Sequence, residues 1–292
     1  MTLLVVGSGG QLGRALQDLV PSARFVDVPA VDLTSRESVA ALDWDGITAV
    51  VNAAAWTAVD PAEQLDRLPT VWDVNATGVF HLAWHARRLD VPLVHVSTDY
   101  VFRGDHTAPI PVDATLDPQG AYGATKAAGE MAAHLAPRHY VVRTSWVFGD
   151  GPNFVRTMRR LAADRPELTV VDDQVGRPTY AVDLARALLA LVDGDAPYGT
   201  YHATGAGDVV SWAAFAAAAV TGTDCTIVPI TTAQYLEKAS QAAPRPPYSA
   251  LDLSSLDRVG VSMRDWREAL ADYLEAEAAA TTDRPAPSGA AP

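Results

Sequence analysis

Short runs of apolar, β-branched residues alternate along the chain with longer Ala- and Leu-rich segments whose apolar positions recur at helical spacing. The short runs predict strands at residues 2–6, 24–28, 48–52, 92–97 and 139–145. The longer segments predict amphipathic helices near residues 11–20, 72–89 and 122–135. Alternation of strands and helices is typical of a parallel sheet with helices on both faces. We therefore expect an α/β fold with a doubly wound, Rossmann-like parallel sheet.

Beyond Arg143 this alternation becomes less regular. A Gly/Pro loop precedes further elements, which are expected as a helix at 154–163, a strand at 168–172 and a helix at 182–192. The prolines of residues 241–252 exclude a helix or an inner strand there, and a last helix is expected at 264–278. This second part predicts a smaller C-terminal lobe that is interleaved with the last strands of the sheet.

The glycines of "VVGSGGQLG" directly follow the first predicted strand and open the first helix. Gly7, Gly10 and Gly13 would let a pyrophosphate approach the backbone N–H groups at the helix N-terminus, where larger side chains would block it. The alternative is that these glycines only form a tight turn. The motif favours a dinucleotide-binding domain at residues 1–143 and about 180–205. A substrate-binding lobe would then comprise 144–179 and about 206–278, followed by a disordered tail at 279–292.

Two aspartates are candidates for contacts with the adenosine part of such a cofactor. Asp27 ends the second predicted strand, where a carboxylate binds ribose hydroxyls and repels a 2′-phosphate, which favours NADH. The alternative is a solvated aspartate at a strand end. Asp32 could contact the adenine amino group or could form a helix cap with Thr34. Small residues after the third strand, Asn52 to Ala55, would let the cofactor lie close to the backbone.

Tyr122 and Lys126 are four residues apart, so they share one face of a predicted helix. Lys126 is one of only two lysines in the chain. A phenol can protonate the alkoxide that forms when a carbonyl accepts hydride, and a nearby ammonium lowers the phenol pKa. Thr98, at the carboxyl end of the fourth strand, would hold that carbonyl; the alternative is a hydroxyl that satisfies a loop N–H. For the pair, the alternative is a solvated helix face.

Composition and charge exclude several classes of function. The chain has 292 residues, 49% of them hydrophobic, and a formal net charge of −13 with scattered basic residues. Nucleic acid and acidic membrane surfaces are therefore not expected as partners. Cys225 is the only cysteine, which excludes an internal disulfide, and we expect it to be a buried, inert thiol. With no apolar segment of membrane-spanning length and no basic N-terminal region, a cytoplasmic location is expected.

Several motifs occur in a fixed order from Leu3 to about Leu274, among them "GSGGQLG", "VNATG", "HVSTDYVFRG", "AYGATKAAGE", "VRTSWVFG", "VVDDQVGRPTY" and "PRPPYSALD". With them the chain resembles the extended short-chain dehydrogenases and, within these, the dTDP-4-dehydrorhamnose reductases. The resemblance implies reduction of the C4 ketone of a dTDP-linked 4-keto-6-deoxy sugar by NADPH or NADH. In the namesake reaction the product is dTDP-L-rhamnose.

The resemblance also implies a set of site residues. The catalytic residues would be Thr98, Tyr122 and Lys126. The cofactor contacts would be Gly7, Gly10, Gln11, Leu12, Gly13, Asp27, Asp32, Leu33, Ala53, Ala54, Thr57, Tyr122 and Lys126. The substrate contacts would be Thr98, Asp99, Tyr122, Trp146, Asn153 and Arg245. No metal ligand is implied.

Some of these assignments have structural alternatives. Asn75 matches an asparagine associated with a water relay, or it marks a helix irregularity beside Gly78. Trp146 would cover the sugar, or it is a core residue. Asn153 could be only a helix N-cap, whereas Arg245 could bind the diphosphate with its guanidinium fork. The prolines and tyrosine around Arg245 depart from the commonest family form, which leaves the preferred sugar open.

Two other functions remain at this stage. One is the reduction of another nucleotide sugar in antibiotic biosynthesis, for example of the dihydrostreptose type. The other is a non-catalytic nucleotide-binding regulatory subunit, like the beta subunit of methionine adenosyltransferase; the intact tyrosine, lysine and threonine argue against it. Members of the family are often dimers, so a homodimer is considered, although the sequence identifies no interface.

Overall fold

The computed structural model describes residues 2–194, 196–239 and 241–282. Its centre is a six-stranded sheet in the order β10-β5-β4-β3-β1-β2, in which every neighbouring pair is parallel. The strands are β1 (Leu3–Val6), β2 (Arg24–Val26), β3 (Ala49–Asn52), β4 (Leu93–Thr98), β5 (His139–Thr144) and β10 (Gly199–His202). This sheet confirms the predicted α/β class.

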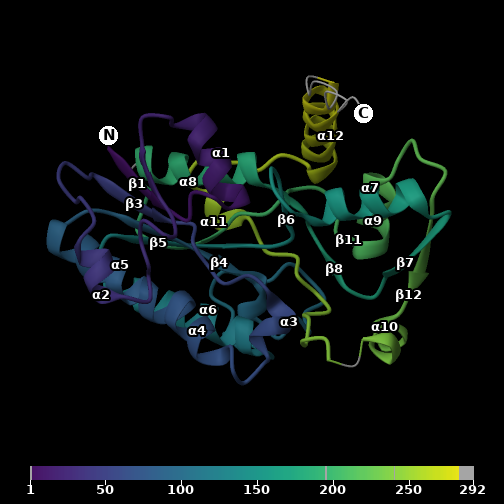
Figure 1. Cartoon of the computed structure of the whole chain (residues 1–292), viewed down its shortest axis with the longest axis horizontal. Coiled ribbons are helices and arrows are strands. Elements are labelled where there is room, and N and C mark those ends of the chain that lie inside the picture. Colours follow the sequence, from purple (N-terminus) through teal and green to yellow (C-terminus); the bar gives the residue numbers. More distant parts are fainter. Residues whose placement is uncertain (1, 195, 240, 283–292) are drawn as a thin grey trace, which may run out of the picture.

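Helices cover both faces of the sheet (Figure 1). One face carries α1 (Gln11–Leu19), α8 (Ala181–Asp193) and α11 (Ser254–Asp257). The other carries α2 (Arg36–Ala40), α5 (Gly78–Leu89) and α6 (Ala121–Ala133). Strand β1 is apolar on both sides, which is why both faces of the sheet are covered. Leu3 and Val5 pack into the cluster with α1 and α8, whereas Leu4 and Val6 pack into the cluster with α5. A strand buried on both faces reads as a continuous apolar run, which is how β1 appears in the sequence.

The single helix expected at residues 72–89 is wrong in its start and in its regularity. Helix α4 (Leu68–Trp72) begins earlier, and a π-helical turn, η1 (Asp73–Thr77), separates it from α5. Gly78 follows this turn, and a Cβ there would lie 2.8 Å from the side chain of Leu33. A short helix α3 (Val59–Ala62) and a 3₁₀ turn η2 (Asp99–Val101) lie in the loops after β3 and β4.

A smaller lobe lies beside the carboxyl end of β5 (Figure 1). Its strands form three two-stranded sheets, which pair β6 (Val147–Phe148) with β9 (Thr179–Tyr180), β7 (Glu167–Val171) with β12 (Thr226–Ile230), and β8 (Val175–Gly176) with β11 (Val210–Ser211). Its helices are α7 (Phe154–Asp164), α9 (Trp212–Ala219), α10 (Thr232–Lys238) and α12 (Trp266–Thr282). The chain returns to the main sheet through α8 and β10 between two parts of this lobe, so the lobe is interleaved as expected.

Two expectations differ from the structure at single positions. Helix α12 continues to Thr282, past the expected end at residue 278, and residues 283–292 of the expected tail lie outside the described residues. Cys225 is only partly buried, because it precedes the edge strand β12 and packs at the margin of the α7–α9 cluster.

Within the described part of the chain, no helix combines the length and apolarity needed to cross a membrane.

Candidate active site

A cavity of about 800 Å³ opens at the carboxyl ends of β1, β3, β4 and β5. In open parallel sheets this edge is where ligands bind, at the point where the strand order reverses. Here the reversal lies between β1 and β3, since the chain goes from β1 outward to β2 and then returns to the other side. The cavity therefore lies where the topology predicts a ligand, and it reaches the lobe at Trp146 and Pro152.

The glycine turn joins β1 to α1 at one end of the cavity. Gly7 has a φ of +87°, and a Cβ there would collide with the backbone of Ala54, which follows β3. A Cβ at Gly13 would collide with the carbonyl oxygen of Gly7. Gly7, Gly10, Gln11 and Leu12 line the cavity, whereas Gly13 does not; Gly13 instead allows α1 to pack against the turn. The N-terminus of α1 is thus open to the cavity, an arrangement that suits an anion.

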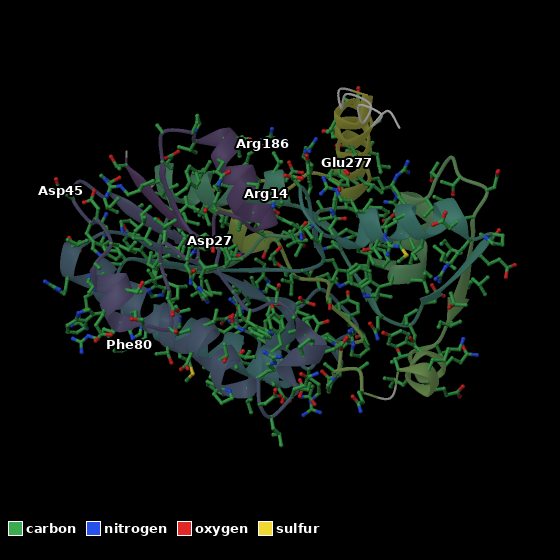
Figure 2. The ribbon with its side chains drawn as sticks, viewed as in Figure 1. Arg14, Asp27, Asp45, Phe80, Arg186 and Glu277 are labelled. Carbon is green, nitrogen blue, oxygen red and sulfur yellow. The ribbon has the colours of Figure 1, made fainter. Side chains whose placement is uncertain are left out.

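Both predicted adenosine-side carboxylates line the cavity. Asp27, labelled in Figure 2, follows β2. Its Oδ2 accepts a hydrogen bond from the Gly9 N–H at 2.7 Å. Asp32 accepts hydrogen bonds at one oxygen from the N–H and the hydroxyl of Thr34, at 2.9 and 2.7 Å. Helix α2 is capped by Ser35 rather than by Asp32, so Asp32 forms a turn before the helix. Leu33, Ala53, Ala54 and Thr57 complete this wall of the cavity.

The three expected catalytic side chains meet at the other end of the cavity. Tyr122 and Lys126 extend from one face of α6, and Thr98 ends β4. Lys126 is almost fully buried, and its Nζ donates a hydrogen bond to the carbonyl of Val96 at 2.6 Å. The Thr98 hydroxyl donates to Oδ1 of buried Asp99 at 2.9 Å. Sequence spacing of four on one helix therefore brings the phenol and the ammonium to the same strand end.

Burial controls the protonation of this cluster. It raises the pKa of the Tyr122 phenol, and the hydrogen bond with Thr98 offsets only part of that rise. The lowering expected from the nearby lysine is therefore not found, because desolvation of the buried phenol outweighs it. Burial lowers the pKa of Lys126 to about 8, against the opposing charge of Glu130. Burial also raises the pKa of Asp99 to about 6, although hydrogen bonds from Ser249 and Thr98 favour its ionised form. The phenol is therefore protonated at neutral pH, and Lys126 still carries its charge there.

Trp146 is the predicted substrate residue that reaches the cavity from the start of the lobe. Its backbone is left-handed, with φ of +50°, and its indole stacks on Trp212 at a centroid distance of 3.7 Å. A left-handed backbone is uncommon for a bulky residue and is often found at functional sites. Asp99 also lines the cavity, immediately after Thr98.

The family described as RmlD substrate binding domain matches residues 1–279. The chain belongs to this family. It is 41% identical to a dTDP-4-dehydrorhamnose reductase of Mycolicibacterium smegmatis over 98% of this chain and 89% of that protein. It is 38% identical to the spore coat polysaccharide biosynthesis protein SpsK of Bacillus subtilis over 95% of this chain and 98% of that protein.

Solved structures of the RmlD family share the fold. The dTDP-4-dehydrorhamnose reductase of Clostridium acetobutylicum has a TM-score of 0.89 and 38% identity, covering 95% of this chain and 100% of that one. The Bacillus anthracis reductase in complex with NADP has a TM-score of 0.87 and 32% identity, covering 94% and 100%. The resemblance predicted from the motifs is thus confirmed.

Two predicted substrate residues of this RmlD-family chain do not line the cavity. Asn153 caps α7, where its Oδ1 accepts from the Arg156 N–H at 2.9 Å and its Nδ2 donates to the Tyr273 hydroxyl at 2.8 Å. Its hydrogen-bonding groups are thus used within the lobe. Arg245 donates from one guanidinium nitrogen to both oxygens of Asp60, at 2.9 and 3.0 Å. It therefore joins the proline-rich loop to α3 instead of pointing into the cavity.

Asn75 lies within the π-helical turn η1, as the structural alternative had it, and it does not line the cavity. Its Oδ1 accepts from the N–H of Trp56 at 2.8 Å, and its Nδ2 donates to the Thr125 hydroxyl at 3.0 Å. Trp56 lines the cavity, and Thr125 precedes Lys126. Asn75 thus joins helix α6, which carries Tyr122 and Lys126, to the loop after β3.

The sequence analysis missed several residues around the catalytic end. Tyr100 lines the cavity and contacts the Tyr122 ring edge-to-face at 5.3 Å. The Glu63 carboxylate accepts a hydrogen bond from the Ala121 N–H at 2.7 Å and so caps α6. Glu130 and Arg143 form a buried ion pair behind Lys126. All four residues lie inside family motifs: Glu63 ends "VNAAAWTAVDPAE", and the other three lie in motifs quoted above. Their position in these motifs was a signal, but their partners are remote in sequence.

Proposed function

We propose that this protein is an NADH- or NADPH-dependent reductase of the C4 ketone of a dTDP-linked 4-keto-6-deoxy sugar. The proposed substrate is dTDP-4-dehydro-L-rhamnose, and the product is dTDP-L-rhamnose. The observation that carries the proposal is that Thr98, Tyr122 and Lys126 line the same cavity as the glycine turn. The dTDP-4-dehydrorhamnose reductases at about 40% identity over nearly the whole chain support the choice of sugar.

The cavity fits a nicotinamide dinucleotide. The absent side chains at Gly7 and Gly10 leave the N-terminus of α1 open to a pyrophosphate, and the Gln11 Oε1 is buried without a hydrogen-bond partner in the described structure. Asp27 and Asp32 would face the adenosine, and Lys126 the nicotinamide ribose. When bound, the cofactor supplies the hydride. The single cysteine and the nicotinamide cofactor suit a reducing cytoplasm.

Side chains of this protein supply the proton that the reduced carbonyl takes up. Tyr122 is the proton donor to the developing C4 alkoxide, because its phenol is protonated at neutral pH in this buried site. Lys126 stabilises the phenolate that results, since its ammonium lies on the same face of α6. Thr98 orients the carbonyl from the end of β4. Together these three side chains stabilise the negative charge that develops on the C4 oxygen.

We further propose that NADH is preferred over NADPH. Among the described residues that line the cavity, Lys126 is the only lysine or arginine, and it lies at the catalytic end. At the other end, Asp27 and Asp32 would repel a 2′-phosphate. The relative in complex with NADP shows that a member of the family can bind the phosphorylated cofactor, so the expected difference is one of efficiency.

The test is the loss of NADH or NADPH absorbance when the purified protein meets freshly made dTDP-4-dehydro-L-rhamnose, with identification of the sugar product. We expect dTDP-L-rhamnose and a higher kcat/KM for NADH. Cofactor binding without oxidation of this sugar would overturn the substrate assignment.

A second substrate has specific support. The chain is 43% identical to a dTDP-4-keto-6-deoxy-D-glucose reductase of Streptomyces niveus over 70% of this chain. This ketone presents the same C4 carbonyl with a different ring configuration. Assaying both ketones under the same conditions shows which one the cavity favours.

A further inference from the structure

Trp146 is held in an unfavourable backbone conformation by the lobe. Its φ of +50° lies in the left-handed region, two residues after the end of β5. Its carbonyl accepts the Thr179 N–H at 3.2 Å, and the Thr179 hydroxyl donates to the Ser145 carbonyl at 2.7 Å. The Ser145 hydroxyl in turn donates to the Arg177 carbonyl at 3.0 Å. A strained residue persists where its surroundings fix it from several sides, and here those surroundings belong to the segment 177–179.

The indole of Trp146 is fixed separately. It stacks on the indole of Trp212 with an interplanar angle of 15° and a centroid distance of 3.7 Å. Trp212 does not line the cavity; it is the first residue of α9 and packs against Phe154 at 4.6 Å. Gly176 approaches the same indole, since a Cβ there would lie 3.0 Å from Trp146 Cε2. The indole of this cavity-lining residue thus has a close stack on Trp212, a more distant one on Phe215 at 6.5 Å, and one close backbone contact.

We propose that Trp212 is a positioning residue for the sugar pocket, which acts by stacking on Trp146, and that Gly176 leaves the room that this ring position needs. The proposal rests on the proposed function, in which Trp146 covers the sugar. Loss of the stack frees the indole to adopt other rotamers, so part of the binding energy for the sugar is spent on ordering the ring. Hydride transfer itself, at Tyr122 and Lys126, is not touched by this stack.

The main variant is Trp212→Leu, and its matched control is Trp266→Leu. Trp266 is also an indole in the lobe's aromatic cluster, but among the described residues it makes no direct ring contact with Trp146 and reaches it only through Phe215. We expect Trp212→Leu to raise KM for the dTDP-4-keto sugar about 3- to 10-fold, the range expected for an aromatic pair. KM for NADH and the value of kcat stay near those of the native enzyme. Trp266→Leu leaves KM for the sugar unchanged even if it lowers the melting temperature.

Two further variants separate positioning from general damage to the lobe. Trp212→Phe keeps an aromatic surface and should restore most of the affinity for the sugar. In Gly176→Ala the new Cβ would lie 3.0 Å from Cε2 of Trp146 and displace its indole, so this variant should also raise KM for the sugar. Exciton coupling in circular dichroism gives an independent readout, because the stacked indole pair should lose its couplet in Trp212→Leu and keep it in Trp266→Leu.

The outcomes are distinguishable. A native enzyme that turns over no dTDP-4-keto sugar overturns the proposed function and with it this proposal. An active native enzyme whose Trp212→Leu variant keeps the native KM for the sugar overturns the positioning role alone. The same holds if Trp266→Leu raises that KM equally, or if Trp212→Leu changes kcat and leaves KM unchanged.

Discussion

At the scale of single residues, the chemistry of the site depends on how deeply its titratable groups are buried. Tyr122 and Lys126 are 9% and 2% exposed, and that burial moves the pKa of the phenol up and of the ammonium down. The two groups therefore remain protonated together at neutral pH. Asp99, also buried, is hydrogen-bonded to Thr98 beside them. Each shift follows from desolvation of the charged form.

Replacing Tyr122 with Phe should lower kcat by about 100-fold or more, because the alkoxide loses its proton donor. The fold should be retained, since the phenol's one described hydrogen bond is with Thr98 inside the cavity and the tyrosine ring stays in place in the variant. The measurement is steady-state oxidation of NADH, with calorimetric binding of the cofactor as the check that the site is intact. Near-native turnover would contradict the proposed mechanism.

The pH dependence of activity should follow Lys126. Its pKa is lowered to about 8, so its ammonium is present below that pH and is lost above it. The charged form stabilises the phenolate, and we therefore expect kcat/KM for the keto sugar to fall as pH rises through about 8. The profile is measured in buffers of constant ionic strength. A flat profile up to pH 10 would show that the charge of Lys126 is not required.

At the scale of elements, helix α6 is fixed at both ends of its catalytic turn. Glu63 caps its N-terminus, and Glu130, one turn after Lys126, pairs with Arg143 of β5. The Ser97 hydroxyl donates to the same carboxylate at 2.5 Å, and Ser97 directly precedes Thr98. The buried pair therefore joins α6 to both strands that end at the catalytic side of the cavity.

Removing the charge of only one partner of this ion pair should lower the stability of the fold. Both side chains are almost fully buried, at 3% exposure for Glu130 and 6% for Arg143. Glu130→Gln leaves a buried guanidinium without its countercharge, which should reduce the free energy of unfolding by about 3–5 kcal/mol. Arg143→Met should cost a similar amount. The double variant Glu130→Gln/Arg143→Met should lose clearly less than the sum, as measured by urea unfolding; strict additivity would argue against coupling of the two charges.

The helix expected at 72–89 shows where local pattern fails at this scale. The apolar spacing of α4 and α5 is helical, but η1 contains an extra residue per turn, and in that turn Asn75 reaches Trp56 and Thr125. Those partners lie in other segments of the chain. Periodicity could therefore predict that a helix exists here but not that it is interrupted.

At the scale of the whole molecule, the proline-rich loop connects the lobe back to the sheet domain. Asp60 of α3 accepts the Ala243 N–H at 2.9 Å and both bonds from Arg245. Burial raises the pKa of Asp60, but the bonds from Arg245 and Ala243 outweigh it, so the net pKa is lowered. Because the folded-state value lies below the unfolded one, this clamp contributes stability above about pH 4 and loses it as the pH falls further.

Removing the Asp60 carboxylate should increase the local opening of the proline-rich loop around Ala243 and Arg245. In Asp60→Ala we expect the Ala243 amide to exchange its hydrogen about fivefold faster, the effect of losing a partly exposed ion pair. Asp66→Ala is the matched control, since Asp66 is an exposed aspartate that pairs only loosely with Arg67 at 3.6 Å. Hydrogen exchange with mass spectrometry reads out the segment. Equal exchange in both variants would show that other contacts hold the loop.

The sequence by itself determined the alternating α/β fold, the glycine turn and the placement of Tyr122 and Lys126 on one face of α6. These features depend on residues that are neighbours along the chain: an apolar run, a strand-to-helix turn, or two side chains four apart on one helix. Their positions in the sheet followed from the rule that parallel strands end at one edge, which brought Thr98 to the same cavity.

The tertiary structure alone decided the roles of residues whose partners are remote in sequence. Asn153 reaches Tyr273 across 120 positions, and Arg245 reaches Asp60 across 185. Neither pair leaves a periodic or local signal, so two residues assigned to substrate became a helix cap and a clamp between the lobe and the sheet domain. The left-handed backbone of Trp146 and its stack on Trp212 have the same origin, since only packed neighbours can hold an unfavourable conformation.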